Sequence, residues 1–486
     1  MKKLIVPAIV FFLLQSLPAQ TFQLFLIRVN AAPDSLKLAI VDSFMNAVPS
    51  FPYLEQDTLA YFLFRGNANQ ITVPGDANGW NQNAFPMQLV SGTNLWYRTE
   101  VFEADARLDY KFVLNGTTWI LDPLNPRTVS GGYGPNSELC MPDYLPAPEI
   151  EYYPNIDHGT IEDTMFYSIN LSNTRQIRVY LPPQYTITGD SFPVILFHDG
   201  SDYLTLGSAR NVIDYLISEH RIEPIIALFV PPVDRNQEYA GSLKTPFTNF
   251  IVQEVFPWLD GKYRTRTYPA SRAIIGASNG GNISLWLGLQ HPDFFGNIGA
   301  QSSNVQDTIA NGFRNGPFLN LKFYLDIGTY DISALIPLVE NFQQILQNRG
   351  YPCQYQVYHE GHSWGNWRAH IDNALEMFFP GSATGIFQVQ HIPDKFTIAQ
   401  NFPNPFNATT VLSIQLHKPE ELDLKIYNVE GQLVREYNIG YSSLGKHFII
   451  WNGKNNRGQQ VPTGMYFARW KIGVNHSAVI KMFLLK

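Results

Sequence analysis

The chain has 486 residues, 45% of them hydrophobic and 15% charged, and its net charge is -7. Such a composition is typical of folded proteins rather than disordered ones, and the length predicts roughly two to four folded units. The acidic balance argues against a basic surface for nucleic acid or for an anionic membrane, so we expect no nucleic-acid partner.

Residues 1–20 combine Lys2 and Lys3, a short apolar run and small residues (MKKLIVPAIVFFLLQSLPAQ). This order predicts a secretory signal peptide. The run is too short to span a bilayer comfortably, and no other stretch reaches the roughly 20 apolar residues of a transmembrane helix. We therefore expect an exported chain with no transmembrane helix after processing. Its two cysteines, Cys140 and Cys353, fit either one bridge or two buried thiols.

The N-terminal part, residues 21–150, combines a helix with short strands. Apolar residues at helical spacing predict a helix over 33–48, with a stripe made of Leu36, Leu38, Ile40, Val41, Phe44 and Met45. Between 59 and 143, short apolar or alternating runs are separated by turn clusters such as DANGWN and SGTN. This punctuation indicates a small antiparallel β-sandwich.

Residues 151–380 follow a different pattern. Apolar strands (FPVILFHDG, PIIALFVPP, RAIIGAS, LKFYLDIG, YQVYHEG) alternate with helical segments around 209–218, 247–259, 282–289 and 334–347. Strict alternation of strands and helices predicts a parallel sheet that helices cover on both faces. A linker is expected at 381–395, and the short strands of 396–486 predict a second all-β module.

Ester hydrolysis needs an activated hydroxyl, a base that takes its proton, and donors for the developing oxyanion. In the segment RAIIGASNGG, a buried strand runs into Ser278 and then into a helix. Strand, sharp turn and helix are the context of a nucleophile elbow, in which flanking glycines avoid collisions. Without that context, a match of this length would be chance. We predict that Ser278 is the nucleophile.

The acid and the base are expected downstream of the serine, in that order. Asp326 and Asp331 compete for the acid role in FYLDIGTYDI; Asp331 is favoured because it follows the strand end, whereas Asp326 lies within the strand. For the base, His362 lies on a loop after a glycine, whereas His359 belongs to the strand end. The HEGH run also invites a zinc hypothesis, but zincin histidines lie four apart on one helix. We expect neither a metal nor a cofactor.

Backbone amides are expected to form the oxyanion hole. The residue after the nucleophile, Asn279, should supply one amide, and Ser201, after the strand PVILFHDG, the other. Residues on loops after strands are candidates for lining the substrate pocket, although each type is also common in packing. These candidates are Asp202, Tyr203, Arg235, Glu238, Tyr239, Trp364 and Trp367.

Several motifs in order (FHDGSDY, VDRNQEY, IVQEVFPWLD, GASNGG, GHSWGNWR) resemble the esterase D family, also called carbohydrate esterase family 1, over about residues 160–379. That family includes enterochelin esterases and the esterases that remove feruloyl or acetyl groups from xylan. The resemblance implies a serine esterase of the α/β-hydrolase fold in which Ser278, Asp331 and His362 form the triad.

The flanking segments carry resemblances of their own. The segment FLFRGNANQITVPGDANGWN and its continuation are similar to glycogen-binding-like modules (CBM48 or E-set), in which Trp80, Trp96 and Trp119 could stack on sugar rings. Trp80, in a turn, is the expected carbohydrate contact. The C-terminal motifs NFPNPFN, VPTGMY and VIKMFLLK resemble type A sorting domains of the type IX secretion system, which implies that machinery as a partner.

The expected architecture is an α/β chain, with an α/β-hydrolase domain flanked by two all-β immunoglobulin-like sandwiches. The expected function is that of a secreted or cell-surface serine ester hydrolase that acts on feruloylated or acetylated plant polysaccharide such as xylan. An enterochelin (siderophore) esterase is the enzymatic alternative. A non-catalytic carbohydrate-binding surface protein is the alternative from another class.

Overall fold

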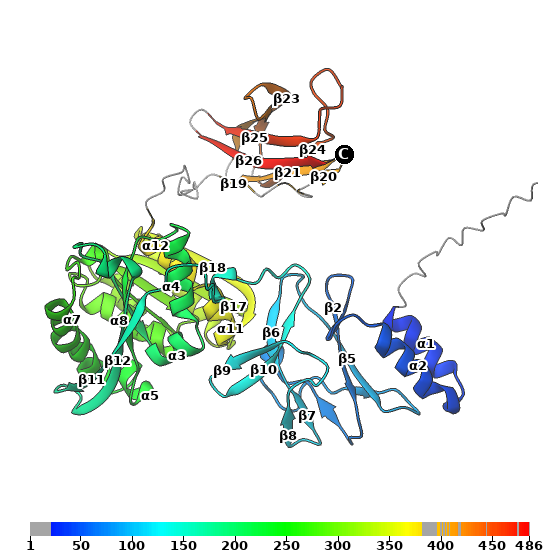
Figure 1. Cartoon of the computed structure of the whole chain (residues 1–486), viewed down its shortest axis with the longest axis horizontal. Helices are drawn as coiled ribbons and strands as arrows, with labels where there is room; N and C mark the ends of the chain where they lie inside the picture. The colour runs from blue at the N-terminus through cyan, green and yellow to red at the C-terminus, as the bar shows by residue number, and fades with distance from the viewer. Residues whose placement is uncertain are drawn as a thin grey trace, which may run out of the picture. The chain divides into compact units, whose positions relative to one another are not determined.

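A computed structural model of the chain gives two compact units, Met1–Ser382 and Ala383–Lys486, which are treated separately (Figure 1). The expected signal peptide, and nearly all of the expected linker, lie outside the described residues. The described residues are 21–381, 396–398, 401, 404, 406–407, 409–416, 419–443, 445–473 and 476–485.

An 11-stranded mixed sheet runs through the first unit, in the order β11-β12-β14-β13-β15-β16-β17-β18-β6-β10-β9. The strands from β14 to β18 in that order are parallel, so their carboxyl ends meet at one edge. The strands are β11 (Thr160–Ser168), β12 (Asn173–Leu181), β13 (Val194–His198), β14 (Ile226–Val230), β15 (Arg272–Ala277), β16 (Asn297–Gln301), β17 (Lys322–Tyr330), β18 (Cys353–Gly361), β6 (Arg107–Tyr110), β9 (Thr128–Gly131) and β10 (Gly134–Cys140).

Helices cover both faces of the parallel part. On β13, Val194 and Leu196 pack into one apolar cluster, and Ile195 and Phe197 into the other, because successive side chains alternate between the faces. The helices are α3 (Gly200–Thr205), α4 (Ala209–Ser218), α5 (Arg235–Tyr239), α6 (Lys244–Asn249), α7 (Phe256–Lys262), α8 (Asn279–Gln290), α9 (Asp307–Asn315), α10 (Ile336–Arg349), α11 (Trp364–Ala369) and α12 (Ile371–Phe378). The expected alternation of strands and helices is therefore present, but β11, β12 and β16 were not expected, and β11 and β12 pair antiparallel, so the sheet is not wholly parallel.

The N-terminal module, residues 21–150, adds two small sheets, β1-β2-β5-β4 and β3-β7-β8. A helical hairpin of α1 (Phe22–Ala31) and α2 (Asp34–Ala47) packs on β2 and β5 through one apolar cluster. The strands are β1 (Tyr53–Glu55), β2 (Leu59–Arg65), β3 (Ile71–Thr72), β4 (Gln88–Leu89), β5 (Leu95–Val101), β7 (Phe112–Leu114) and β8 (Thr118–Ile120).

The hairpin differs from the expectation in two respects. Helix α1 was not expected, and in α2 the residues Leu36 and Leu38 are 54% and 48% exposed while Lys37 is buried. The buried face of α2 is set by Val41 and Phe44, which pack against the sheet. The expected apolar stripe was therefore wrong at Leu36 and Leu38.

The N-terminal module and the α/β part share one sheet. Strand β6 pairs in parallel with β18 through Arg107 and Glu360, and β10 and β9 continue the sheet beyond it. Figure 1 shows these strands beside β18 and α11. The expected boundary between residues 150 and 151 thus lies inside one compact unit. Cys140, on β10, and Cys353, on β18, are both free thiols.

The second unit is all-β, with sheets β19-β21-β24 and β20-β26-β25-β22-β23 around a core that contains Trp451 and Trp470. Its strands are β19 (Phe396–Ile398), β20 (Phe406–Asn407), β21 (Thr410–Leu416), β22 (Glu420–Asn428), β23 (Leu433–Ser442), β24 (Gly445–Trp451), β25 (Gly464–Ile472) and β26 (His476–Leu485). None of the helices within the described residues of either unit is long and apolar enough to cross a membrane.

Candidate active site

Ser278 lies at a sharp turn between the fully buried strand β15 and helix α8. Its backbone has φ 57° and ψ -121°, a left-handed conformation that costs an L-residue on the order of 1–3 kcal/mol. Two glycines make the turn possible: a Cβ on Gly276 would lie 2.4 Å from the Gly280 backbone, and one on Gly280 would lie 3.0 Å from Asp199 Oδ2.

Hydrogen bonds from neighbouring segments hold the Ser278 backbone in this conformation. Its amide donates to Gln301 O at 2.8 Å, and its carbonyl accepts from Asn282 N at 3.2 Å and from Asn304 N at 3.3 Å. The strain is thus supported by the end of β16 and by the first turn of α8. The local sequence creates the elbow, and its neighbours fix it.

His362 and Asp331 meet at the same edge of the sheet. Asp331 directly follows β17 and His362 directly follows β18, and the Nδ1 of the histidine lies 2.7 Å from Asp331 Oδ1. Because an ionised carboxylate can only accept, Nδ1 carries the proton and Nε2 is left free to act as a base. The Asp331 side chain is fully buried, and that of His362 is 20% exposed. The imidazole can therefore exchange protons with a bound substrate.

Asp326, the competing acid, lies in a different environment. Its side chain is buried within β17, where Oδ2 accepts from Gln301 Nε2 at 3.0 Å and Oδ1 accepts from the Ser302 amide at 3.2 Å. Burial raises its pKa to about 6. Its hydrogen bonds go to the residues beneath the Ser278 turn, and none goes to His362 among the described residues.

A chain of contacts connects Ser278 with His362. Gln301 accepts from the Ser278 amide and donates its own side-chain amide to Trp367 O at 3.1 Å, and the Trp367 ring lies edge-on to His362 with centroids 4.9 Å apart. The Trp367 indole also donates to Ser302 Oγ at 3.0 Å. Within the described part of the chain, no hydrogen bond joins the Ser278 hydroxyl to His362. In free enzymes such bonds are often long and tighten when substrate binds.

The two predicted oxyanion donors belong to the first turns of two helices. Asn279 is the first residue of α8, and Ser201 is the second of α3, after Asp199 with its φ of 53°. Among the described residues, neither amide has a backbone acceptor. The Ser201 hydroxyl accepts from Arg178 Nη1 at 3.1 Å. Both amides are therefore available to a ligand.

Arg235 couples the two loops that carry these amides. Its guanidinium forms a bidentate pair with Asp199, with both N–O distances 2.8 Å, and donates to Ala277 O at 3.0 Å. Asp199 is 3% exposed, and burial raises its pKa. Arg235 thus acts on the geometry of the site; its side chain is 37% exposed and can also meet a ligand.

Several predicted pocket residues are buried instead, which corrects that expectation. Tyr203, Glu238 and Tyr239 have no exposed surface. Tyr203 donates to Gln301 Oε1 at 2.9 Å, Glu238 pairs with Arg175 at 2.9 Å, and the Tyr239 hydroxyl accepts from the Asp199 amide at 2.9 Å. Their loops follow strands, as expected, but their side chains turn inward to satisfy buried polar groups.

The remaining candidates differ in exposure. Asp202 is exposed on α3, whereas Trp364 and Trp367 are 8% and 6% exposed and pack against each other. In the N-terminal module, Trp119 is 41% exposed and Trp96 is buried. Trp80 is half-buried, and its indole donates to Asp76 Oδ1 at 2.9 Å. Trp80, the expected carbohydrate contact, is therefore less exposed than Trp119, and the hydrogen bond ties its ring to the module.

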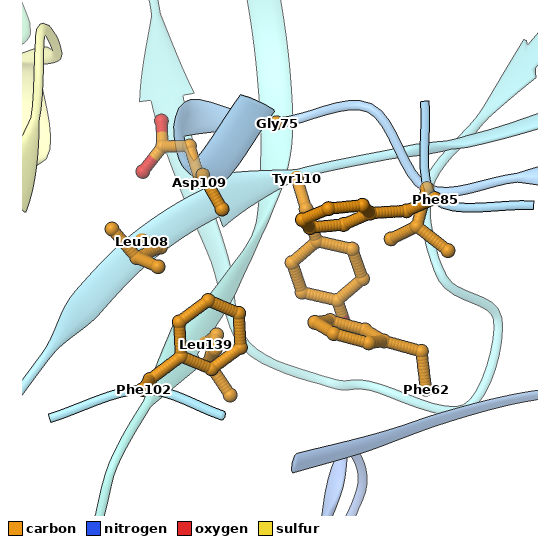
Figure 2. A pocket seen from close by; sticks show the side chains of 10 residues that line it. Phe62, Gly75, Phe85, Phe102, Leu108, Asp109, Tyr110 and Leu139 are labelled. Atoms are coloured by element: carbon orange, nitrogen blue, oxygen red, sulfur yellow. The ribbon is translucent and has the colours of Figure 1, made fainter. Parts of the chain in front are cut away.

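Two cavities lie elsewhere. One, of about 10 Å³, is inside the N-terminal module; Figure 2 shows the rings of Phe62, Phe85 and Tyr110 around it, with the Asp109 carboxylate directed away from the rings. The other, of about 240 Å³, is lined in part by His158. Neither includes a predicted site residue, so neither adds to the candidate site.

Some residues that support the site were missed by sequence reasoning. Gln301 ends the short strand β16, whose sequence NIGAQ has little apolar periodicity, and Ser302 directly follows that strand. Arg107 donates from the N-terminal module to Ser363, next to His362, at 3.2 Å. No sequence signal connects residues so far apart in the chain.

Comparisons with known proteins bear on this geometry. Residues 168–378 match the family described as "Putative esterase", and residues 401–469 match the "FlgD Ig-like domain". The chain is 28% identical over 234 residues to the uncharacterized protein YjcH of Bacillus subtilis. The aligned stretch covers 45% of this chain and 97% of that protein. It is 25% identical over 176 residues to an endo-1,4-beta-xylanase/feruloyl esterase of Xylanibacter ruminicola. That alignment covers 33% of this chain and 24% of the relative.

The fold also matches a solved structure. The enterobactin esterase FES from Shigella flexneri, crystallised in the presence of enterobactin, superposes with a TM-score of 0.59 and 19% identity over 69% of this chain and 97% of that one. This stretch is longer than residues 168–378, so the shared fold extends beyond the esterase region. The chain therefore contains a region that matches an esterase family model and has an α/β-hydrolase-like fold.

Proposed function

We propose that the chain is a serine carboxylic ester hydrolase in which Ser278 is the nucleophile, His362 the general base and Asp331 the acid that orients the histidine. The observation that carries the proposal is the 2.7 Å contact between His362 and Asp331 at the sheet edge to which the strained Ser278 turn also belongs. A serine, an imidazole and a buried carboxylate are the three parts of a proton-transfer triad.

In the proposed reaction, Ser278 Oγ attacks the ester carbonyl carbon while its proton passes to His362 Nε2. The tetrahedral oxyanion accepts hydrogen bonds from the amides of Asn279 and Ser201. As the ester C–O bond breaks, His362 returns the proton to the leaving alcohol, and an acyl-serine remains. Water then attacks the acyl group with His362 again as base, which releases the acid and restores the serine.

For the substrate, we propose feruloyl or acetyl esters on plant polysaccharide such as xylan. The relative from Xylanibacter ruminicola, which is named an endo-1,4-beta-xylanase/feruloyl esterase, supports this choice. A siderophore triester is the second candidate, because the fold shared with the enterobactin esterase extends beyond the esterase region. Turnover of methyl ferulate, acetylated xylan and an enterobactin-type triester by one preparation would separate the two.

We further propose that the chain is exported, with residues 1–20 as its signal peptide and the C-terminal unit as a sorting domain. The family match to an Ig-like domain at 401–469 supports a separate β-rich unit there. Recovery of the protein from the culture medium or cell surface, with an N-terminus close to residue 21, is the expected result. Retention in the cytoplasm with an intact N-terminus would contradict the proposal.

The test of the enzymatic role is the mature chain assayed on p-nitrophenyl acetate beside Ser278→Ala, with Ser218→Ala, on α4, as the matched control. Ser278→Ala should lower kcat by about 10³-fold or more, while Ser218→Ala keeps the wild-type rate. A fluorophosphonate probe should label the wild type at Ser278. Equal rates for wild type and Ser278→Ala, or no activity on any ester of the panel, would favour a non-catalytic carbohydrate-binding role.

A further inference from the structure

The loops that carry Asp331 and His362 rest on the N-terminal module. Tyr330, immediately before Asp331, donates to Glu103 Oε2 at 2.6 Å and packs against Phe102 with ring centroids 6.0 Å apart. On β18, the Nδ1 of His359 lies 2.6 Å from Asp105 Oδ1. The short segment 102–107 therefore contacts both strands whose ends hold the proposed acid and base.

The contact is tightest around His362 itself. A Cβ on Gly361, the residue before it, would lie 2.1 Å from Asp76 Cγ, and a Cβ on Gly365 would lie 2.1 Å from Arg107 Cζ. Glycine is needed at both positions because the N-terminal module occupies that space. The segment 361–365 is thus packed directly against Asp76 and Arg107.

Arg107 holds this segment by a hydrogen bond as well as by packing. Its side chain is fully buried; Nη1 donates to Ser363 Oγ at 3.2 Å, while the other nitrogens pair with Asp109 and Glu138, each at 2.7 Å. Ser363 caps α11 by accepting from the Asn366 amide. The arginine therefore fixes the residue that both follows His362 and caps the next helix.

The charges around Arg107 keep it in place. Burial by itself lowers the pKa of the guanidinium, but the carboxylates of Asp109, Glu138 and Glu360 hold that pKa well above its ordinary value. Glu360, on β18, is itself buried and bonded to His370 Nε2 at 2.8 Å. Without this cation, the buried carboxylates of both modules would have no compensating positive charge, which is strongly destabilising.

We propose that Arg107 is a positioning residue of the esterase site: acting from the N-terminal module through Ser363, it fixes the 361–365 segment and so the ring of His362. This inference rests on the proposed role of His362 as general base. It makes the N-terminal module part of the active site, whether or not that module also binds sugar. A displacement of about 1 Å at a reacting group costs on the order of 10²-fold in rate, so loss of the Arg107 side chain should lower kcat.

The experiment uses the full mature chain with Arg107→Met, Arg107→Lys, Ser363→Ala and the double variant Arg107→Lys/Ser363→Ala. Arg65→Met is the matched control, because Arg65 belongs to the same module but pairs with Asp42. The readouts are kcat and KM on p-nitrophenyl acetate and the amide hydrogen exchange of the peptide 361–367 in the resting protein.

We expect Arg107→Met to lower kcat by about 100-fold with KM within about twofold, and Arg107→Lys to recover part of the loss, since lysine keeps the charge but not the planar fork. Exchange in 361–367 should become about tenfold faster in Arg107→Met. Because Arg107 acts through Ser363, the double variant should be no slower than its slower parent. Arg65→Met should match the wild type in every readout.

Wild-type kcat and wild-type exchange in the Arg107 variants would overturn the proposal, and strictly additive losses in the double variant would exclude the route through Ser363. If Arg107→Met does not fold, Arg107→Lys and Ser363→Ala decide the matter. An inactive wild type would count against the proposed function instead, and hydrogen exchange at 361–367 would still test whether Arg107 holds the His362 loop.

Discussion

His362 and Asp331 are joined by a 2.7 Å contact, and the second oxygen of Asp331, although buried, has no hydrogen-bond partner within the described residues. Oδ1 of Asp331 also accepts from the Ile332 amide at 2.6 Å. Because the carboxylate is shielded from water, it interacts strongly with the imidazole. In the proposed mechanism, Asp331 orients the imidazole and favours the positively charged form that arises when Ser278 gives up its proton.

Replacing Asp331 by asparagine should therefore lower kcat by about 10³-fold or more with little change in KM, because the amide favours the wrong imidazole tautomer. Steady-state kinetics on p-nitrophenyl acetate measure this effect. Asp326→Asn is the comparison, since Asp326 bonds to Gln301 and Ser302 instead. A larger loss of kcat in Asp326→Asn than in Asp331→Asn would transfer the acid role to Asp326.

The pair of Arg235 and Asp199 predicts a combined loss of stability and activity. Arg235→Gln leaves a buried carboxylate without its bidentate partner and frees the Asp199 turn from Ala277. We expect about 2–3 kcal/mol less free energy of unfolding, below the value for a fully buried pair because the Arg235 side chain is 37% exposed. We also expect a lower kcat, because both oxyanion loops depend on the pair.

The matched control for that change is Arg266→Gln. Arg266 pairs with Glu223 at 2.8 Å, and both side chains are 30% exposed, so the loss should stay below about 1 kcal/mol. Urea unfolding of both variants and the wild type gives the comparison. Equal losses in the two variants would mean that the Arg235 pair is an ordinary surface ion pair.

Asp326 predicts a pH-dependent stability. Its pKa is about 6 in the folded chain against an ordinary value of 3.8, because burial disfavours the charged form. Below pH 3.8 both states are protonated, and the group has no effect. Between 3.8 and 6 the unfolded chain ionises first, so stability falls as pH rises, by about 3 kcal/mol once pH exceeds the folded pKa.

The measurement for Asp326 is the free energy of unfolding in urea from pH 4 to 7 for the wild type and Asp326→Asn. Other buried acids titrate in both proteins, so the informative quantity is the difference between the two curves. We expect this difference to move in favour of the variant as pH rises from 4 to 6. A constant difference across that range would contradict the assignment.

The two thiols should react slowly in the folded protein. Burial raises the pKa of Cys140 to about 11 and that of Cys353 to about 12, so at pH 8 the reactive thiolate is scarce. Alkylation by iodoacetamide, followed by mass spectrometry, should be roughly 100-fold slower than for the urea-unfolded chain. If the unfolded, unreduced chain takes up no label, the two cysteines form a bridge instead of the free thiols described.

The elbow at Ser278 could be predicted because it is a local feature. A buried strand, small residues that admit a left-handed turn and a helix lie within a few positions of one another, and each carries its own pattern. The same holds for β13 and β17 and for helices such as α4, found where the alternation of apolar runs placed them. The roles of Ser278, His362 and Asp331 stay predictions until the variants are assayed.

Only the tertiary structure decided which groups face one another. Whether Asp326 or Asp331 meets His362 depends on where strands β17 and β18 end in register, and the inward turn of Tyr203 and Tyr239 depends on buried polar partners. Arg107 and Ser363, which contact each other, lie 256 positions apart in the chain. Hydrogen bonds and ion pairs between distant segments depend on three-dimensional placement, and no periodicity along the chain records them.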